Sequence, residues 1–431
     1  MAEATLCVGI DFGTSGCRAI AIDPAGAVQA EVTRPLPPPL RDGAAVEQNP
    51  EDWTTSLAQL LTALTANVDP AAIVAVAVDG TSGTLLLADD NGTPLGPALM
   101  YNDARAATEA AAMRDVVPRE SAAHGTASGL AKLLWLHHHT DTSRAAHVLT
   151  QADYINGLLG DRRDVSDANN VLKLGYDPHR GDWPQWLSHL GVSHALLPQV
   201  VAPGTPIGTL RSTFAARHGL HRDTLLVAGT TDGTAAFLAT GASRPGEAVT
   251  SLGSTLVLKL LSEQPLYAPE YGIYSQPLGD LWLVGGGSNS GGAVLRHYFS
   301  DAEMAAMTPR LQPDHPTGLD YYPLLRPGER FPTADPQLAP RLTPRPANDV
   351  QFFQGLLEGI AHIEQQGYRR LAELGAPYPL SVRTVGGGAH NPAWSTMRAH
   401  LLGIPMLTPR HEQAAYGTAL LALRGWRSTR Q

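Results

Sequence analysis

An acidic residue followed by a turn of glycine and hydroxyl side chains is the first candidate for chemistry in this sequence. Asp11 precedes Gly13, Thr14 and Ser15. Backbone N–H groups next to glycine can approach phosphate oxygens closely, and the two hydroxyls add further donors. A carboxylate at Asp11 could hold a hydrated Mg²⁺ between phosphates. The alternative interpretation of this segment is an ordinary tight hairpin.

A second carboxylate, Asp232, lies in the segment LLVAGTTDGT at residues 225–234. The segment predicts a strand that runs into a helix at residues 235–240. A carboxylate at such a junction can accept the proton of a substrate hydroxyl. The alternative is an aspartate that only caps the helix.

A third candidate is the segment GGGAHNPAW at residues 386–394. Gly387 and Gly388 would leave a flat floor, Asn391 would offer an amide, and Trp394 would form an apolar wall. This combination suits an adenine ring. The alternative is a strand-to-helix turn with a half-buried tryptophan.

The elements that must position these residues are short apolar runs joined by turns. Three pairs of runs predict β-hairpins, at residues 6–10 with 18–22, 73–78 with 84–88, and 249–252 with 256–261. The first and third hairpins share the same kind of tip, which suggests two related halves.

Two further segments predict a strand, a glycine run and a helix, at residues 281–299 and 382–402. Helices are also predicted at residues 50–66, 129–138, 351–374 and 413–423, and the last two show apolar residues at helical spacing. Strands and helices alternate, which indicates an α/β fold. The proline-rich region from Pro309 to Pro346 is expected to be a surface excursion that could form a lid or a cap.

Composition excludes several classes of protein. The chain has 431 residues and a formal charge of −9, with no basic stripe that would bind nucleic acid. It contains no apolar stretch long enough for a membrane span, and its first residues do not resemble a signal peptide. The two cysteines, Cys7 and Cys17, are expected to be buried on neighbouring strands of a cytoplasmic protein. No Walker A or Rossmann motif occurs. Three consecutive histidines, residues 137–139, are expected at a solvated helix end.

Taken together and in order, the motifs resemble the FGGY carbohydrate kinases of the actin/sugar kinase/Hsp70 superfamily. The segments that carry the resemblance are GIDFGTSG at residues 9–16, residues 101–105, 132–136, 151–154, 228–233 and 251–255, GGGAHNPAW at 386–394, and residues 414–423. Tyr101 stands where the family usually has tryptophan, which leaves the packing at the sugar end open.

The resemblance implies an α/β fold of two ribonuclease H-like, actin-like ATPase domains flanking a catalytic cleft. The expected domains are residues 1–240, on which a C-terminal helix at 412–431 could pack, and residues 241–411. The resemblance also assigns site residues: a first phosphate loop of Asp11, Gly13, Thr14 and Ser15, a second of Gly253, Ser254 and Thr255, an adenosine site of Gly387, Gly388, Asn391 and Trp394, and a catalytic base at Asp232. ATP and Mg²⁺ are the implied cofactors, with Asp11 and Asp232 as metal ligands.

The acceptor is expected to be a pentulose. Where xylulokinases carry Gln-Met-His-Gly, residues 79–84 of this chain are DGTSGT, which resembles the D-ribulose kinases of cyanobacteria and plants. The sugar is then expected to lie against Thr81 and Ser82, with Asp103 and Asp232 within reach. Xylulokinase, or another kinase of polyols or ketoses, is the alternative within the family.

Two interpretations from other classes remain open. One is an actin- or Hsp70-like ATPase without a sugar acceptor, for which no peptide-binding module follows the fold. The other is a sugar-binding relative without activity, against which the presence of Asp11 and Asp232 argues. The sequence gives no indication of the oligomeric state.

Overall fold

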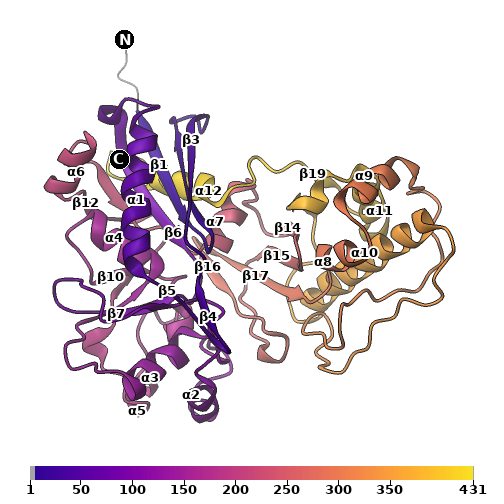
Figure 1. The fold of residues 1–431 in the computed structure, drawn as a ribbon, viewed down its shortest axis with the longest axis horizontal. Helices are drawn as coiled ribbons and strands as arrows, with labels where there is room; N and C mark the ends of the chain where they lie inside the picture. Colours follow the sequence, from indigo (N-terminus) through magenta and orange to yellow (C-terminus); the bar gives the residue numbers. More distant parts are fainter. Residues whose placement is uncertain (1–4, 431) are drawn as a thin grey trace. The chain divides into compact units, whose positions relative to one another are not determined.

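The computed structural model describes residues 5–430, which divide into two compact units. Unit 1 contains the described residues up to Ala239 and those from Gln413 onward, and unit 2 is Thr240–Glu412. Both units contain strands and helices interspersed along the chain, as the labels in Figure 1 show. The predicted α/β class is therefore confirmed.

The main sheet of unit 1 has six strands in the order β12-β13-β6-β1-β2-β3. Their bounds are β1 Leu6–Phe12, β2 Gly16–Ile22, β3 Val28–Pro35, β6 Ile73–Gly80, β12 Pro206–Thr209 and β13 Leu225–Val227. Strand β1 runs antiparallel to β2 and parallel to β6, which in turn is parallel to β13. The carboxyl ends of β1, β6 and β13 therefore lie at one edge of the sheet.

Smaller elements complete unit 1. A five-stranded sheet contains β4 Leu40–Asp42, β5 Ala45–Gln48, β8 Ala98–Leu99, β7 Leu85–Ala88 and β9 His147–Thr150, and a separate pair contains β10 Val165–Asp167 and β11 Gln199–Val201. The helices are α1 Pro50–Thr65, α2 Ala107–Ala112, α3 Gly129–His139, α4 Gln151–Leu159, α5 Trp186–His189, α6 Ser212–His218, α7 Asp232–Ala239 and α12 Ala414–Ser428.

Unit 2 is built on one six-stranded sheet with four helices. Its strands, in sheet order, are β16 Gln276–Leu278, β17 Leu281–Ser288, β15 Leu256–Ser262, β14 Glu247–Leu252, β18 Ser381–Val385 and β19 Met406–Leu407. Its helices are α8 Gly292–Tyr298, α9 Asp301–Met307, α10 Asp349–Glu373 and α11 Pro392–Leu402.

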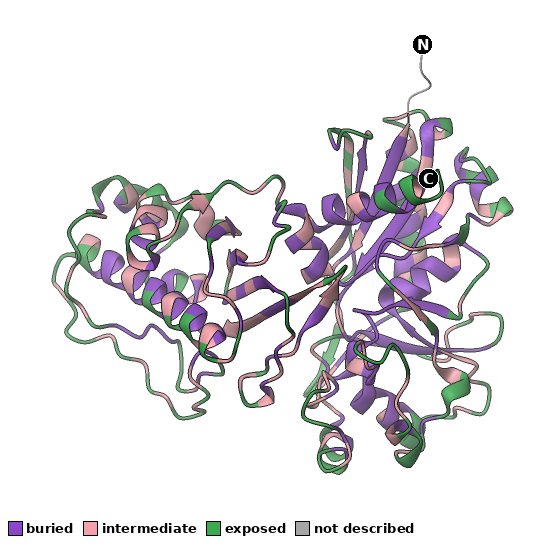
Figure 2. Ribbon diagram, turned by 180° about the vertical axis from the view of Figure 1, so that it is seen from behind, coloured by how far each residue is buried: buried purple, intermediate pink, exposed green. Residues whose placement is uncertain are grey.

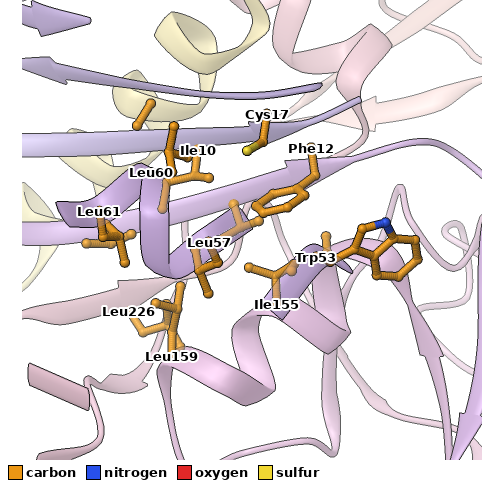
Figure 3. Packing of buried hydrophobic residues seen from close by; sticks show 14 of the residues in the cluster. Ile10, Phe12, Cys17, Trp53, Leu57, Leu60, Leu61, Ile155, Leu159 and Leu226 are labelled. Atoms are coloured by element: carbon orange, nitrogen blue, oxygen red, sulfur yellow. The ribbon is translucent and has the colours of Figure 1, made fainter. Parts of the chain in front are cut away.

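The core of unit 1 forms because alternate residues of β1 point to opposite faces of the sheet. On one face Ile10 and Phe12 pack against Trp53 and Leu57 of α1, together with Ile155 of α4 (Figure 3). All five side chains are buried. Figure 2 shows that burial extends along the central strands of this sheet. This packing fixes the position of β1, the strand that carries Asp11 near its carboxyl end.

Helix α12 covers the other face of the same sheet. A side chain at Gly9 would place its Cβ 2.1 Å from the carbonyl oxygen of Ala415, so only glycine allows this approach. Ala415 and Ala419 pack there with Cys7 of β1. A segment from the far end of the sequence thus supports the central strands of unit 1 (Figure 1).

Two of the three predicted hairpins are confirmed, those of β1 with β2 and of β14 with β15. The prediction for residues 73–88 is wrong, because β6 already has β1 and β13 as neighbours on its two sides. After Gly80 the chain leaves this sheet, and β7 pairs with β8 and β9 in the smaller one.

The glycine run at residues 285–287 is a second difference from expectation, because it lies inside β17 and not in a turn. A Cβ at Gly286 would lie 2.7 Å from the ring of Phe331. Phe331 belongs to the 309–346 excursion, whose Glu329 accepts hydrogen bonds from Ser288 and Asn289. This part of the excursion is thus a packed cap on unit 2.

The two cysteines and the three consecutive histidines lie where the sequence predicted them. Cys7 and Cys17 are buried on the neighbouring strands β1 and β2, as predicted. His137, His138 and His139 form the exposed last turn of α3, also as predicted. Across residues 5–430, no helix combines the length and the apolar character that crossing a bilayer requires.

Candidate functional site

Three aspartates meet at the carboxyl edge of the main sheet of unit 1. Asp11 on β1 and Asp79 on β6 are register partners. A bridge between Gly80 and Thr231 then brings the next carboxylate, Asp232, beside the end of β6. Asp232 is the first residue of α7 and is half-buried. The fold thus gathers carboxylates from three segments that are far apart in the sequence.

Burial determines the charge state of this group. Burial is the main cause that raises the pKa of Asp11 to about 6; a hydrogen bond with Asp79 opposes this shift and the charge of Asp232 adds to it. Burial, followed by the charge of Asp11, raises the pKa of Asp79 well above its usual range. Asp79 therefore keeps its proton and donates a hydrogen bond to Asp11, which remains the anion.

The contacts of Asp79 agree with this assignment. Its side chain is completely buried, its Oδ2 accepts a hydrogen bond from the hydroxyl of Thr418 on α12, and no donor reaches its Oδ1. A protonated oxygen that faces another carboxylate needs no donor. The sequence interpretation gave Asp79 no role, although its position after an apolar run, like that of Asp11, was visible.

The turn that follows Asp11 is held through its backbone. The N–H of Gly13 donates to the carbonyl oxygen of Gly16 at 3.0 Å. The carbonyl oxygen of Thr14 accepts from Gln48 at 2.9 Å, and that of Ser15 accepts from a backbone N–H, also at 2.9 Å. Ser15 is exposed, whereas Gly13 and Thr14 are half-buried. The backbone of the turn is thus fixed, the N–H of Gly13 is used within the turn, and Ser15 is its most accessible residue.

The residues predicted to face an acceptor differ in their accessibility. Thr81 is only 3% exposed, and its hydroxyl donates to Oε1 of Gln151 at 2.8 Å and lies 2.5 Å from that of Thr84. Ser82 is half-buried. In this arrangement Thr81 holds the turn together, and Ser82 is the hydroxyl residue that remains accessible.

Asp103 is also enclosed. It is 0% exposed, accepts from the backbone N–H of Val46 at 2.7 Å, and forms an ion pair of 2.6 Å with Arg105. Arg105 also pairs with Glu47 at 2.7 Å. In this arrangement Asp103 orients Arg105, and its own oxygens face protein groups. The sequence motif does not show that Asp103 is used by these contacts with the protein itself.

Unit 2 contains a pocket of about 540 Å³ that is lined by five of the seven nucleotide-binding residues predicted in this unit. Gly253, Gly387, Gly388, Asn391 and Trp394 all contribute to its wall. The tip of the β14–β15 hairpin borders it, and there Ser254 is exposed and Thr255 is half-buried. The pocket brings together segments that lie more than a hundred residues apart.

Two of these residues have structural duties that the sequence did not indicate. Oδ1 of Asn391 accepts from the backbone N–H of Trp394 at 3.0 Å and caps α11. Trp394 is 2% exposed, and its Nε1 donates to the carbonyl oxygen of Leu357 at 2.9 Å. A Cβ at Gly388 would lie 2.6 Å from the Trp394 ring, so glycine is required there. The tryptophan is thus a buried back wall of the pocket.

Arg296 on α8 is a pocket residue that sequence reasoning missed. The first turn of α8 is bound to the hairpin tip, because the N–H groups of Gly292 and Ala293 donate to the carbonyl oxygens of Gly253 and Ser254 at 2.8 and 3.0 Å. An arginine one turn along that helix therefore reaches the same pocket. A cation shortly after a glycine pair was the available sequence feature.

The carboxylates of unit 1 also bear on the implied metal. Within residues 5–430, no group of three or more His, Cys, Asp or Glu side chains is arranged to hold a metal ion by itself. Mg²⁺ in phosphoryl-transfer sites uses one or two carboxylates, with phosphate oxygens and waters as its other ligands. The anion of Asp11 and the neighbouring Asp232 fit that requirement.

Comparisons with known proteins agree with this geometry. The family model "FGGY family of carbohydrate kinases, N-terminal domain" matches residues 6–239, and the corresponding C-terminal domain model matches residues 248–426. These ranges fall within unit 1 and largely within unit 2, with the second extending into α12.

Individual relatives cover almost the whole chain. A xylulose kinase of Bacillus subtilis is 26% identical over 97% of this chain and 88% of its own length. An autoinducer-2 kinase of Escherichia coli is 27% identical over 96% of this chain and 85% of its own length. The crystal structure of a xyloylose kinase from Brucella ovis has a TM-score of 0.88 at 25% identity, covering 98% of this chain and 91% of that chain.

Proposed function

Because the chain belongs to the FGGY family of carbohydrate kinases, we propose that it transfers the γ-phosphate of ATP to the terminal hydroxyl of a pentulose. The observation that carries this proposal is the position of Asp232, the first residue of α7, next to the anion of Asp11 and the protonated Asp79. A half-buried carboxylate beside a second anion is suited to accept a proton from an alcohol.

In this proposal Asp232 orients the attacking hydroxyl and takes its proton. The turns at Gly13–Ser15 and Gly253–Thr255 supply N–H and hydroxyl donors to phosphate oxygens, a task that needs no lysine. Asp11, with Asp232, would hold Mg²⁺, which when bound neutralises charge on the phosphates. The protonated Asp79 keeps the carboxylate of Asp11 in place by donating a hydrogen bond to it.

We place the adenosine of ATP in the pocket of unit 2. Its glycine floor at residues 387–388 admits a flat ring, and Trp394 closes its back. The side-chain oxygen of Asn391 caps α11, so we propose that this residue shapes the wall of the pocket. Arg296 is then a cation within reach of the nucleotide.

Within the pentuloses, D-ribulose is the acceptor that we propose first, phosphorylated on O5. The support is the DGTSGT segment at residues 79–84, in which the accessible Ser82 replaces the larger side chains typical of xylulokinases. D-xylulose is the second candidate, since the relatives named above include xylulose kinases.

The test is sugar-dependent ADP release by the purified protein over a panel of pentuloses, hexuloses and polyols. We expect the highest kcat/KM with D-ribulose, exceeding D-xylulose by roughly ten- to a hundred-fold, because a site that pairs a hydroxyl rejects the epimer. A higher kcat/KM with D-xylulose would contradict the assignment of D-ribulose as acceptor but would leave the proposed kinase activity intact. A rate of ADP release that does not change with any sugar would favour an ATPase of the actin or Hsp70 type.

Ser82→Ala examines the specificity argument directly. Removing the hydroxyl should lower kcat/KM for D-ribulose more than for D-xylulose, and thus narrow the gap between the two sugars. The matched control is Ser143→Ala, which removes an exposed hydroxyl elsewhere in unit 1. If Ser82→Ala lowers both sugars equally, Ser82 does not distinguish them.

A further inference from the structure

Two lysines hold consecutive carbonyl oxygens of the turn that contains Ser82. Nζ of Lys132, on α3, donates to the carbonyl oxygen of Gly83 at 2.8 Å. Nζ of Lys173 donates to the carbonyl oxygen of Ser82 at 3.1 Å. The chain has only three lysines, so two of the three converge on one turn.

Lys132 also joins this turn to a second segment. Its Nζ donates to the carbonyl oxygen of Met100 at 2.6 Å, immediately before Tyr101. The N–H of Tyr101 in turn donates to the hydroxyl of Thr84 at 3.0 Å. The turn at residues 81–84 and the start of the 101–105 segment are therefore held together by a single buried ammonium group and a hydroxyl.

This ammonium group is in an unfavourable environment for a charge. Lys132 is 0% exposed. Its pKa is lowered to about 7, mainly by burial and also by the charges of Lys173 and Arg105, while the charge of Asp103 acts in the opposite direction. A buried amine is costly compared with an apolar side chain of similar size. What the lysine provides that a methionine could not is donors for two backbone carbonyls.

The turn is fixed from its other end as well. The backbone N–H of Thr81 donates to Oε1 of Gln151 at 2.9 Å. Gly83 has a φ of +91°, and a Cβ there would lie 3.1 Å from the side chain of Lys173. Ser82 is thus held on both sides and at its own carbonyl oxygen, while its side chain stays accessible.

We propose that Lys132 and Lys173 are positioning residues for the acceptor: they clamp the carbonyl oxygens of Gly83 and Ser82, so that the Ser82 hydroxyl is presented to the sugar. The inference rests on the proposed function, because it takes the turn at residues 81–84 as the acceptor side of the reaction. Neither lysine touches the reacting atoms.

A purely structural role predicts something different. If the lysines only stabilised unit 1, their loss would lower the melting temperature and would affect the nucleotide and the acceptor alike. Positioning of Ser82 predicts a selective rise in the KM of the acceptor. The KM of ATP and kcat should then stay close to the wild type.

The test compares Lys173→Ala, Lys173→Arg and the matched control Lys259→Ala, which changes the third lysine, on β15 of unit 2. Kinetics are measured with whichever acceptor of the panel the wild type phosphorylates best. We expect Lys173→Ala to raise the KM of that acceptor about ten-fold, because a displaced polar group is left unpaired. Lys173→Arg should restore most of the loss, and Lys259→Ala should leave the acceptor KM unchanged.

Lys132→Met is the second variant, and it should raise the acceptor KM more than Lys173→Ala does. If it does not fold, the two Lys173 variants decide. Equal rises in the KM of ATP and of the acceptor, or no rise with Lys173→Ala, would overturn the clamp. If the wild type prefers another class of acceptor, only the pentulose proposal fails. If the wild type phosphorylates no acceptor, the proposed function and the lysine clamp both fail.

Discussion

Asp232 is the side chain on which the proposed chemistry depends most directly. Asp232→Asn keeps the shape of the residue but cannot accept a proton. We expect acceptor phosphorylation to fall by about 10²–10⁴-fold, the usual contribution of a general base. Nucleotide binding, measured by calorimetry, should remain close to the wild type because the pocket of unit 2 is unchanged.

The control for this variant is Asp90→Asn, which changes an exposed aspartate of the same unit. It should turn over like the wild type. Normal phosphorylation by Asp232→Asn would show that this carboxylate takes no part in the proton transfer.

Asp167 on β10 gives the molecule a pH dependence that can be measured apart from activity. Its pKa is raised to about 7, mainly by burial and also by the charge of Asp153. In the unfolded chain an aspartate has a pKa of about 3.9. The folded state therefore binds the proton more tightly, and this contribution to stability is complete below about pH 4 and is lost as the pH rises through about 7.

Asp167→Asn removes that titration. Its free energy of unfolding, measured with urea at several values of pH, should become more favourable relative to the wild type as the pH rises from about 4 to about 7. Asp164→Asn, at an exposed aspartate paired with Arg162, should show no such trend. A constant difference between Asp167→Asn and the wild type at every pH would contradict the prediction.

Helix α12 packs on the elements that carry the three aspartates of unit 1. It packs on β1, β6 and α7, which carry Asp11, Asp79 and Asp232, and its Thr418 donates directly to Asp79. A Cβ at Gly417 would lie 1.9 Å from the carbonyl oxygen of Ala235 on α7. The two helices can therefore approach this closely only because residue 417 is glycine.

Gly417→Ala sets two effects against each other. Alanine favours the helix by about 1 kcal/mol, but the clash is with backbone and overpacking of a core typically costs about 1–3 kcal/mol. We expect a net loss of stability and a lower kcat, because α7 begins at Asp232. Gly96→Ala is the control, since a Cβ there meets nothing within 4 Å. A variant as stable as the wild type would mean that α12 and α7 separate without cost.

The division into two units predicts that the two ligands protect different segments from hydrogen exchange. A non-hydrolysable ATP analogue should protect residues 253–255 and 386–391 of unit 2, and the acceptor should protect residues 79–84 of unit 1. The comparison is made on the full-length chain with each ligand alone. Protection of residues 79–84, without residues 386–391, by the nucleotide would place it in the wrong unit.

Local features determined what could be predicted from the sequence. Apolar runs and glycine turns gave the β1–β2 and β14–β15 hairpins, the helix from Pro392 to Leu402 and the position of Asp232 at a strand–helix junction. Each depends on neighbours within a few residues. Wrong predictions, such as a hairpin of β6 with β7, arose where the partners of a strand come from elsewhere in the chain.

The tertiary structure alone decided the functions of Asp79, Lys132 and Thr418. Parallel register sets Asp79 beside Asp11, the packing of α12 brings Thr418 to Asp79, and the folding of α3 carries Lys132 to the turn at residues 81–84. The sequence placed an aspartate, a lysine and a threonine in these segments but not next to any partner. The physical reason is that buried charges and hydroxyls acquire their roles from the groups that satisfy them, and those groups are distant in the chain.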